Sequence, residues 1–335
     1  MNFRVLGKTG YRITEIGVGT WQLGGGWGQP FDEKNADRTL NEAVDMGYNF
    51  IDTADSYSDR LSERAVGRLI KQRKERIYVA TKIGRRLKPH VTAGYTEENI
   101  RKFVDESRSN LGMDCLDLVQ LHCPTTQIFY HPEIFDLMDQ LVAEGKIAHY
   151  GVSVQRVEQA LKALEYPNIA TIQIVFNMFR QRPENILLPE AKKRNVGIIA
   201  RVPLASGLLS GKFDKNTTFP EGDYRLTNGR GEPVPYDPEG YGLRGEIFAG
   251  VDYEVGLKAV EEWKKILPSE QFAQYAIKWI LMHEAVSVTV VGAGNPKHLQ
   301  SNWDASEVPA LSQEQMSEIK KIYQKYFFNT VHQIW

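Results

Sequence analysis

The stretch that decides the fold is residues 49–57, Asn-Phe-Ile-Asp-Thr-Ala-Asp-Ser-Tyr. A short apolar strand here ends in a carboxylate, Asp52, and a phenol, Tyr57, follows in the next loop. The next two apolar runs end in the same way, with an ammonium at Lys82 and an imidazole at His122. A parallel barrel builds its catalytic site from such groups at the C-terminal tips of successive strands. Together, these four group types can move a proton near neutral pH.

The remainder of the chain repeats the alternation of strand and helix. Apolar strands are expected at residues 16–19, 49–52, 77–82, 116–122, 148–153, 171–175, 197–202 and 286–292. Every strand but the last is followed by helical periodicity, as at residues 36–46, 62–71, 96–111 and 132–144. Eight such units predict an α/β fold, a (β/α)8 TIM barrel. Residues 3–14 read as an N-terminal β-hairpin with a Gly-rich turn, which closes the barrel.

The amino-acid composition does not change in a way that marks a second domain, so residues 1–335 are expected to form a single domain. The competing fold is an open doubly wound sheet. That fold requires a Gly-rich dinucleotide fingerprint after its first strand, and residues 17–22 lack the third glycine.

The overall composition limits the kinds of binding partner that the chain is expected to have. The 335 residues contain 41 Lys and Arg against 42 Asp and Glu, so no charge excess favours nucleic acid or an anionic membrane. Cys115 and Cys123 form no disulfide framework and no zinc spacing, and the scattered histidines suggest no metal cluster. With no signal peptide and no apolar run that could span a membrane, the reducing cytoplasm is the expected location. The sequence does not predict the oligomeric state.

Two segments depart from the strand–helix rhythm. Residues 213–252 form a long stretch rich in Gly, Pro, Asp and Tyr after the seventh barrel strand. Loops of this length inside compact domains are usually functional lids or disordered, and this one would overhang the catalytic face. Residues 326–335 are aromatic for a tail, which predicts that they pack against the body of the protein.

The four strand-end groups suit one reaction. A phenol has a reference pKa near 10, and the Lys82 ammonium should lower the pKa of Tyr57. Asp52 would keep Lys82 charged and in place, and His122 would donate to the same substrate oxygen. Such a set fits carbonyl reduction, in which hydride reaches carbon and a proton reaches oxygen. Taken singly, each residue could instead cap a helix, end a strand or sit in a loop.

The chain resembles the aldo-keto reductases from Leu6 to about Asn302. The residues that carry this resemblance are Gly17-Val18-Gly19-Thr20-Trp21, Asp52-Thr53-Ala54-Asp55-Ser56-Tyr57, Ser62-Glu63, Thr81-Lys82, Leu121-His122-Cys123-Pro124, Gly145-Lys146-Ile147, Gly151-Val152-Ser153, Gln173 and the run from Pro203 to Lys212. The resemblance implies a (β/α)8 barrel and a nicotinamide cofactor bound without a Rossmann domain. It also implies a catalytic tetrad of Tyr57, Lys82, Asp52 and His122.

The resemblance extends to cofactor and substrate residues. The implied cofactor contacts are Gly19, Thr20, Trp21, Asp52, Ser153, Gln173, Arg201, Pro203, Leu204, Ser206, Gly207, Leu209, Ser210, Lys212, Gly292, Gly294, His298 and Asn302. The implied substrate contacts are Trp21, Tyr57 and His122. No metal is implied.

The turn after the seventh strand offers a phosphate site. Backbone N–H groups of Ser206, Gly207, Leu209 and Ser210 could cradle a pyrophosphate, with charge added by Lys212. A plain flexible turn is the alternative.

Five positions depart from the family pattern; two of them are His298, which replaces a frequent Gln, and Ser301, which replaces a frequent Glu. Val154 replaces the usual Asn beside Ser153, which removes one carboxamide contact. Arg201 stands where an aromatic ring often stacks on the nicotinamide; it could lie flat on that ring, attract an anionic substrate, or pair with a loop carboxylate. Gly294 replaces a frequent Arg, which weakens the case for a 2′-phosphate. Lys297 or His298 could compensate, so NADP(H) is favoured and NAD(H) is the alternative.

The sequence thus predicts an NADPH-dependent oxidoreductase that reduces an aldehyde or ketone, sugar-like substrates included, with Tyr57 as general acid. NAD-dependent oxidation of an alcohol or sugar is the reverse alternative. A cofactor-binding regulatory subunit with little turnover is another, and a barrel lyase or isomerase without nicotinamide is a third. The physiological substrate is set by loops that carry no readable code.

Overall fold

The computed structural model describes residues 1–229 and 245–335. Eight parallel strands close into a barrel in the order β10-β3-β4-β5-β6-β7-β8-β9. Their bounds are β3 Ile16–Gly19, β4 Phe50–Asp52, β5 Tyr78–Ile83, β6 Leu116–His122, β7 Ile147–Ser153, β8 Thr171–Val175, β9 Gly197–Arg201 and β10 Val286–Gly292. The predicted (β/α)8 fold is confirmed, and the strand boundaries agree with the sequence to within one residue.

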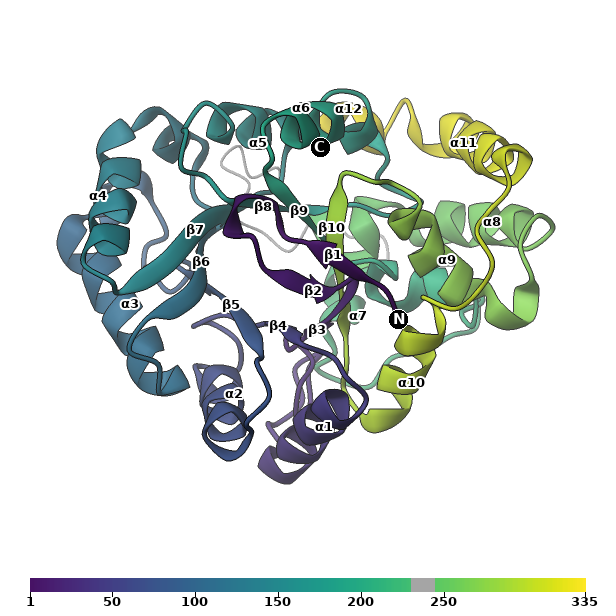
Figure 1. The fold of residues 1–335 in the computed structure, drawn as a ribbon. Coiled ribbons are helices and arrows are strands. Elements are labelled where there is room, and N and C mark those ends of the chain that lie inside the picture. Colours follow the sequence, from purple (N-terminus) through teal and green to yellow (C-terminus); the bar gives the residue numbers. More distant parts are fainter. Residues whose placement is uncertain (230–244) are drawn as a thin grey trace.

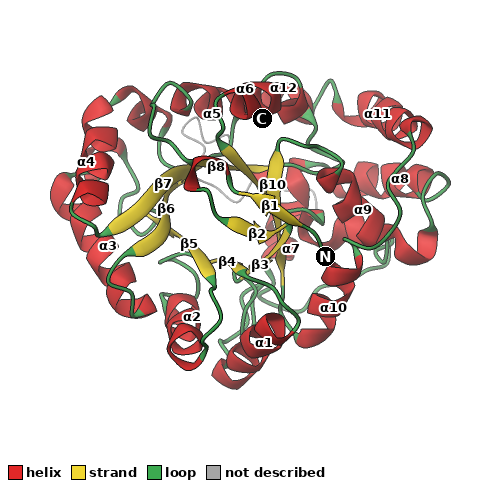
Figure 2. Ribbon diagram, viewed as in Figure 1, coloured by secondary structure: helices red, strands yellow, loops and turns green. Residues whose placement is uncertain are grey.

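A ring of helices surrounds the barrel (Figures 1 and 2). The helices that follow barrel strands are α1 Glu33–Asp45, α2 Leu61–Gln72, α3 Glu97–Leu111, α4 Pro132–Ala143, α5 Val157–Ala163, α6 Leu187–Lys193, α8 Tyr253–Trp263, α9 Phe272–Leu281 and α10 Pro296–Asp304. The last of these corrects the expectation that no helix follows the eighth strand. Its start is fixed by Asn295, whose side chain accepts a hydrogen bond from the His298 backbone N–H.

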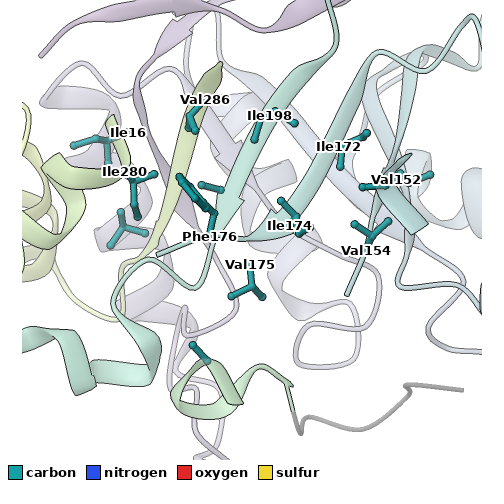
Figure 3. Close-up of a cluster of buried hydrophobic side chains, with 14 of the residues drawn as sticks. Ile16, Val152, Val154, Ile172, Ile174, Val175, Phe176, Ile198, Ile280 and Val286 are labelled. Atoms are coloured by element: carbon teal, nitrogen blue, oxygen red, sulfur yellow. The ribbon is translucent and has the colours of Figure 1, made fainter. Parts of the chain in front are cut away.

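The strands alternate between two cores, because successive side chains point to opposite faces. Outward residues pack against the helices, as Ile172, Ile174 and Ile198 do in the cluster that includes Ile280 of α9 (Figure 3). Inward residues fill the bottom of the barrel; they are Phe50, Ala80, Leu118, Ile199, Val288 and Val290. This inner layer leaves the opposite, C-terminal end of the barrel for polar groups.

The N-terminal hairpin closes the bottom, as expected (Figure 1). Strands β1 Phe3–Val5 and β2 Arg12–Thr14 pair antiparallel, and Leu6 and Ile13 join the inner core. The turn comes so close to the barrel that a Cβ at Gly7 would lie 2.1 Å from the backbone nitrogen of Gly197. Gly7 also has a φ of +49°, so glycine meets both demands.

The two segments that depart from the rhythm behave differently. In the long stretch after β9, the described parts form α7 Tyr224–Gly229 and a 3-10 turn, η7 Ile247–Gly250, whereas residues 230–244 of the expected lid lie outside the described residues. The aromatic tail packs as predicted: after α11 Gln313–Phe327 comes α12 Val331–Ile334, and Trp335 is buried.

The assignment of residues 1–335 to a single domain stays a prediction. Within residues 1–229 and 245–335, no helix combines the length and apolar character needed to cross a membrane.

Candidate active site

The tetrad predicted from the sequence meets at the C-terminal mouth of the barrel. Its strand residues lie an even number of positions beyond an inner-core residue of the same strand: Asp52 after Phe50, Lys82 after Ala80 and His122 after Leu118. Strand periodicity therefore turns all three side chains inward. Tyr57 reaches the same point from the loop after β4.

Lys82 is the hub of this cluster. Its Nζ donates to Asp52 Oδ2 at 2.7 Å, to the Thr53 carbonyl at 2.7 Å and to the Tyr57 hydroxyl at 3.2 Å. Burial opposes a charge on Lys82, but the Asp52 carboxylate and the Tyr57 phenol outweigh it and raise the pKa of Lys82. The lysine is therefore held as an ammonium.

Tyr57 departs from one expectation. Burial raises the pKa of its phenol above the ordinary value, and the Lys82 ammonium acts in the opposite direction without reversing the shift. The expectation of a net lowered pKa was wrong because desolvation of the phenolate is the larger effect. A phenol with a raised pKa stays protonated at neutral pH.

The turn that carries Tyr57 is strained. The next three residues, Ser58, Asp59 and Arg60, have φ values of 47°, 47° and 74°, which non-glycine residues rarely adopt. Strain of this kind persists only where surrounding contacts over-determine the backbone, and it is common at functional sites.

His122 faces Tyr57. The two rings meet edge to face with centroids 5.9 Å apart, and Ser56 Oγ lies 3.5 Å from His122 Nδ1. Burial holds the pKa of His122 well below its ordinary value, and Arg85 and Lys82 add to the effect. At neutral pH the ring is neutral and carries one N–H, which makes it a hydrogen-bond donor without net charge.

Gln173 and Ser153, the pair expected near a carboxamide, lie beside the tetrad. Gln173 Nε2 donates to Asp52 Oδ1 at 2.7 Å, and Ser153 Oγ donates to Gln173 Oε1 at 3.5 Å. Both side chains are buried. Asp52 therefore orients the Gln173 amide, and Gln173 in turn orients the Ser153 hydroxyl.

Arg201 forms the loop ion pair that was one of its three alternatives. Its Nη1 lies 3.1 Å from Glu246 Oε1, and its Nη2 donates to the Val154 carbonyl at 3.2 Å. Val154, the departure from the family pattern, thus contributes its backbone instead of a side-chain amide. Arg85 approaches the same Glu246 oxygen at 3.7 Å.

A cavity of 560 Å³ joins these groups to the rest of the predicted cofactor site. The predicted residues that line it are Gly19, Trp21, Asp52, Tyr57, His122, Gln173, Arg201, Pro203, Leu204, Ser206, Gly207, Ser210, Lys212, Gly292, His298 and Asn302. Four predicted cofactor contacts are not in this lining. Thr20, Ser153 and Leu209 are buried behind it, and Gly294 lies at its edge near Gln22 and His298.

A second group of lining residues was not among the predicted contacts: Gln22, Ser56, Arg85, Val202, Arg225, Glu246, Ile247, Ala273, Val290, Val291 and Ser301. Val290 and Val291 could have been found from the strand that carries them. Glu246 and Arg225 could not, because the long loop has no periodicity from which to infer a direction. Trp27 also lines the cavity and packs edge-on against Trp21, with centroids 4.8 Å apart.

The predicted phosphate cradle is only partly available. The N–H groups of Gly207 and Leu209 both donate to the Leu204 carbonyl, at 2.9 and 3.1 Å. They close the turn instead of facing a ligand, which corrects the four-amide cradle. Ser206, Ser210 and Lys212 remain as polar residues of this turn that line the cavity.

At the far end of the cavity, α10 carries the predicted clamp. Asn302 donates to the Gly292 carbonyl at 3.5 Å. Burial and the nearby charge of Lys212 lower the pKa of His298. Lys212 and His298 both belong to the lining of the cavity.

Comparison with known proteins agrees with this geometry. Residues 15–324 match the model of the aldo/keto reductase family. The chain belongs to the aldo/keto reductase family. This membership confirms the expected oxidoreductase class and NAD(P)H-dependent carbonyl reduction.

Relatives span both nicotinamide cofactors. The chain is 26% identical over 317 residues to aldo-keto reductase yakc of Schizosaccharomyces pombe, named for NADP(+), covering 92% of this chain and 88% of that protein. It is 27% identical over 319 residues to the NADH-specific methylglyoxal reductase of Escherichia coli, covering 89% and 91%. Among solved structures, the glycerol dehydrogenase AKR11B4 of Gluconobacter oxydans matches with a TM-score of 0.77 and 28% identity, covering 97% and 96%.

Proposed function

We propose that this aldo/keto reductase reduces an aldehyde or ketone with hydride from NADPH, and that Tyr57 is the general acid. The observation that carries the assignment is the position of Lys82 Nζ, 2.7 Å from Asp52 and 3.2 Å from the Tyr57 hydroxyl. The phenol holds its proton at neutral pH and lies beside a fixed ammonium, which stabilises the phenolate once the proton has left.

His122 and Tyr57 divide the work at the substrate oxygen. The neutral His122 ring donates an N–H that orients the carbonyl and stabilises the negative charge that develops on oxygen. Tyr57 then transfers its proton to that oxygen. Asp52 holds Lys82 and, through Gln173, the wall of the cofactor site. In the reverse direction the same groups would accept the proton of an alcohol, as the name of the glycerol dehydrogenase relative suggests.

The residues present fit a nicotinamide dinucleotide. When bound, such a cofactor supplies the hydride. The cavity runs from the tetrad past the polar turn at Ser206 and Ser210 to Asn302, so one ligand could span it. Lys212 and His298 both line this cavity, so a 2′-phosphate bound there could meet an ammonium and an imidazole.

The Lys212 ammonium in the cavity lining and the predominant use of NADP(H) in this family are our reasons for favouring NADP(H) over NAD(H). The test is direct titration of the purified protein with NADPH and NADH, followed by the fluorescence of the reduced nicotinamide. NADPH should bind at least about tenfold more tightly, because a phosphate contact with a charged group contributes more than 1 kcal/mol. Tighter binding of NADH would overturn the choice of cofactor and leave the reaction assignment intact.

Tyr57→Phe tests the general acid. The variant keeps the ring that packs 4.8 Å from Lys82 Nζ but removes the proton. Turnover should fall about 1,000-fold with NADPH affinity unchanged. Tyr130→Phe is the matched control, since Tyr130 is 65% exposed and is not part of the cavity lining. Full turnover by Tyr57→Phe would exclude the assigned role.

The proposed partner is a small carbonyl or alcohol. Neither nucleic acid nor a membrane enters this function, and a cytoplasmic location remains what the sequence predicts.

A further inference from the structure

The tetrad end of the cavity contains a carboxylate that carbonyl reduction does not require. Glu246 Oε1 lies 3.1 Å from Arg201 Nη1 and 3.7 Å from Arg85 Nη1, and the Glu246 side chain is 21% exposed in the cavity lining. Burial alone would raise the pKa of Glu246, but the two guanidiniums hold it below its ordinary value. A substrate at Tyr57 would therefore meet an ionised carboxylate.

The backbone around Glu246 is fixed from the cofactor side. Ser206, in the polar turn after β9, donates its hydroxyl to the Glu246 carbonyl at 3.5 Å and accepts from the Phe248 N–H at 3.2 Å. Phe248 and Ala249 have φ values of 50° and 57°, a conformation rare for residues with a side chain. The chain tolerates this strain in the segment that presents Glu246.

A buried arginine fixes the same segment from the other side. Arg180 Nη1 donates to the carbonyls of Gly245 and Ala249, both at 3.2 Å. Its guanidinium lies 4.8 Å from the ring of Trp335, and a Cβ at Gly245 would meet that ring at 2.9 Å. Trp335 thus lies against the residue that precedes Glu246.

We propose that Glu246 is the specificity-determining residue of this enzyme and selects neutral, hydroxylated carbonyl substrates by accepting a hydrogen bond from a substrate hydroxyl. The inference rests on the proposed function, since it places that hydroxyl beside the carbonyl at Tyr57. Glu246 lines the cavity, so its carboxylate is within reach of a substrate hydroxyl. Arg180 and Trp335 are positioning residues that hold the carboxylate in place.

The charge pattern favours a hydroxyl over other groups. An anionic substrate would be attracted by Arg85 and Arg201 but would be repelled by the Glu246 carboxylate, which forms an ion pair with each of them. A cationic substrate would be repelled by the same arginines. An apolar chain would displace water from charged groups without replacing its hydrogen bonds, and sites of this kind strongly reject such analogues. A hydroxyl can donate to the carboxylate and accept from a guanidinium.

The first test uses the wild-type enzyme with NADPH and three aldehydes: glyceraldehyde, its apolar isostere 2-methylbutanal, and the anionic succinic semialdehyde. We expect kcat/KM for glyceraldehyde to exceed that for 2-methylbutanal by about 100-fold. Equal values, or a preference for succinic semialdehyde, would overturn the inference while leaving the proposed function standing. NADPH oxidation with none of the three would contradict the proposed function and the inference together.

The second test removes the charge of Glu246. In Glu246→Gln, kcat/KM for glyceraldehyde should fall about tenfold and its preference over 2-methylbutanal should shrink, because the charged acceptor of the substrate hydroxyl is gone. Glu254→Gln, at an exposed carboxylate of α8, is the matched control and should change neither value. An unchanged preference in a folded Glu246→Gln would overturn the inference.

A third variant separates positioning from folding. Trp335→Ala should raise KM for glyceraldehyde about fivefold while kcat and NADPH affinity stay within about twofold, and Trp335→Phe should restore KM. If kcat fell together with the rise in KM, and Trp335→Phe restored neither, the positioning role would be contradicted.

Discussion

Lys82 and Asp52 form a salt bridge of 2.7 Å between side chains that are 1% and 4% exposed. A pair so removed from water has no solvent to replace either partner. The bridge therefore ties the stability of the barrel to the same two groups that we assign to catalysis. Breaking it should affect folding as well as turnover.

Lys82→Met leaves the Asp52 carboxylate buried without its counter-charge, and this variant should lower the free energy of unfolding by about 3 kcal/mol. Urea unfolding followed by tryptophan fluorescence measures the change. The double variant Lys82→Met/Asp52→Asn should recover most of the loss, because no isolated charge remains. Lys193→Met, at a lysine 69% exposed, is the control. A single variant as stable as the wild type would contradict this account of the bridge.

Asp55 should make stability depend on pH. Both of its carboxyl oxygens are buried and have no hydrogen-bond partner among residues 1–229 and 245–335. Burial, with a further contribution from Glu63, raises its pKa from 3.8 to about 8. The folded state thus binds the Asp55 proton more tightly than the unfolded state does. Its contribution to stability is complete below the unfolded pKa and is lost as pH rises through the folded pKa.

The expected loss from this one group between pH 4 and pH 8 is at most about 5 kcal/mol. Asp55→Asn cannot ionise, so its free energy of unfolding should fall less over this range and exceed that of the wild type at pH 8.5. Denaturant unfolding at several pH values measures both slopes. Asp59→Asn, at a side chain 79% exposed, serves as the control. Identical slopes for wild type and Asp55→Asn would refute the raised pKa.

Gly294→Arg should strengthen NADPH binding. A Cβ at Gly294 would lie 3.5 Å from the Gln22 carbonyl oxygen and 3.9 Å from His298 Nδ1, which are ordinary contacts. A guanidinium there could bind a 2′-phosphate with charge-assisted hydrogen bonds, so NADPH affinity should rise about tenfold with NADH affinity unchanged. Fluorescence titration measures both. A similar gain for both cofactors would mean that the new arginine reaches the shared part of the molecule.

Much of the barrel and its tetrad could be read from the sequence, because strand periodicity carries direction as well as position. An inward core residue such as Ala80 fixes the inward direction of Lys82 two positions later. Helix α10 was missed, since its residues were interpreted as a cofactor clamp and not as a helix. The pKa of Tyr57 was predicted with the wrong net direction, because the degree of burial is not written in local sequence.

The sequence by itself determined the eight barrel strands, the helical segments after the first seven, the hairpin beneath them and the types of group at the strand tips. Only the tertiary structure placed Glu246 between Arg201 and Arg85, and Trp335 beside Gly245. It also showed that two amides of the predicted phosphate cradle bond within their own turn. The physical reason is how far apart in the sequence the contacts that orient a side chain lie. Strand residues inherit their direction from nearest neighbours, whereas loop residues take theirs from contacts with segments far away in the chain.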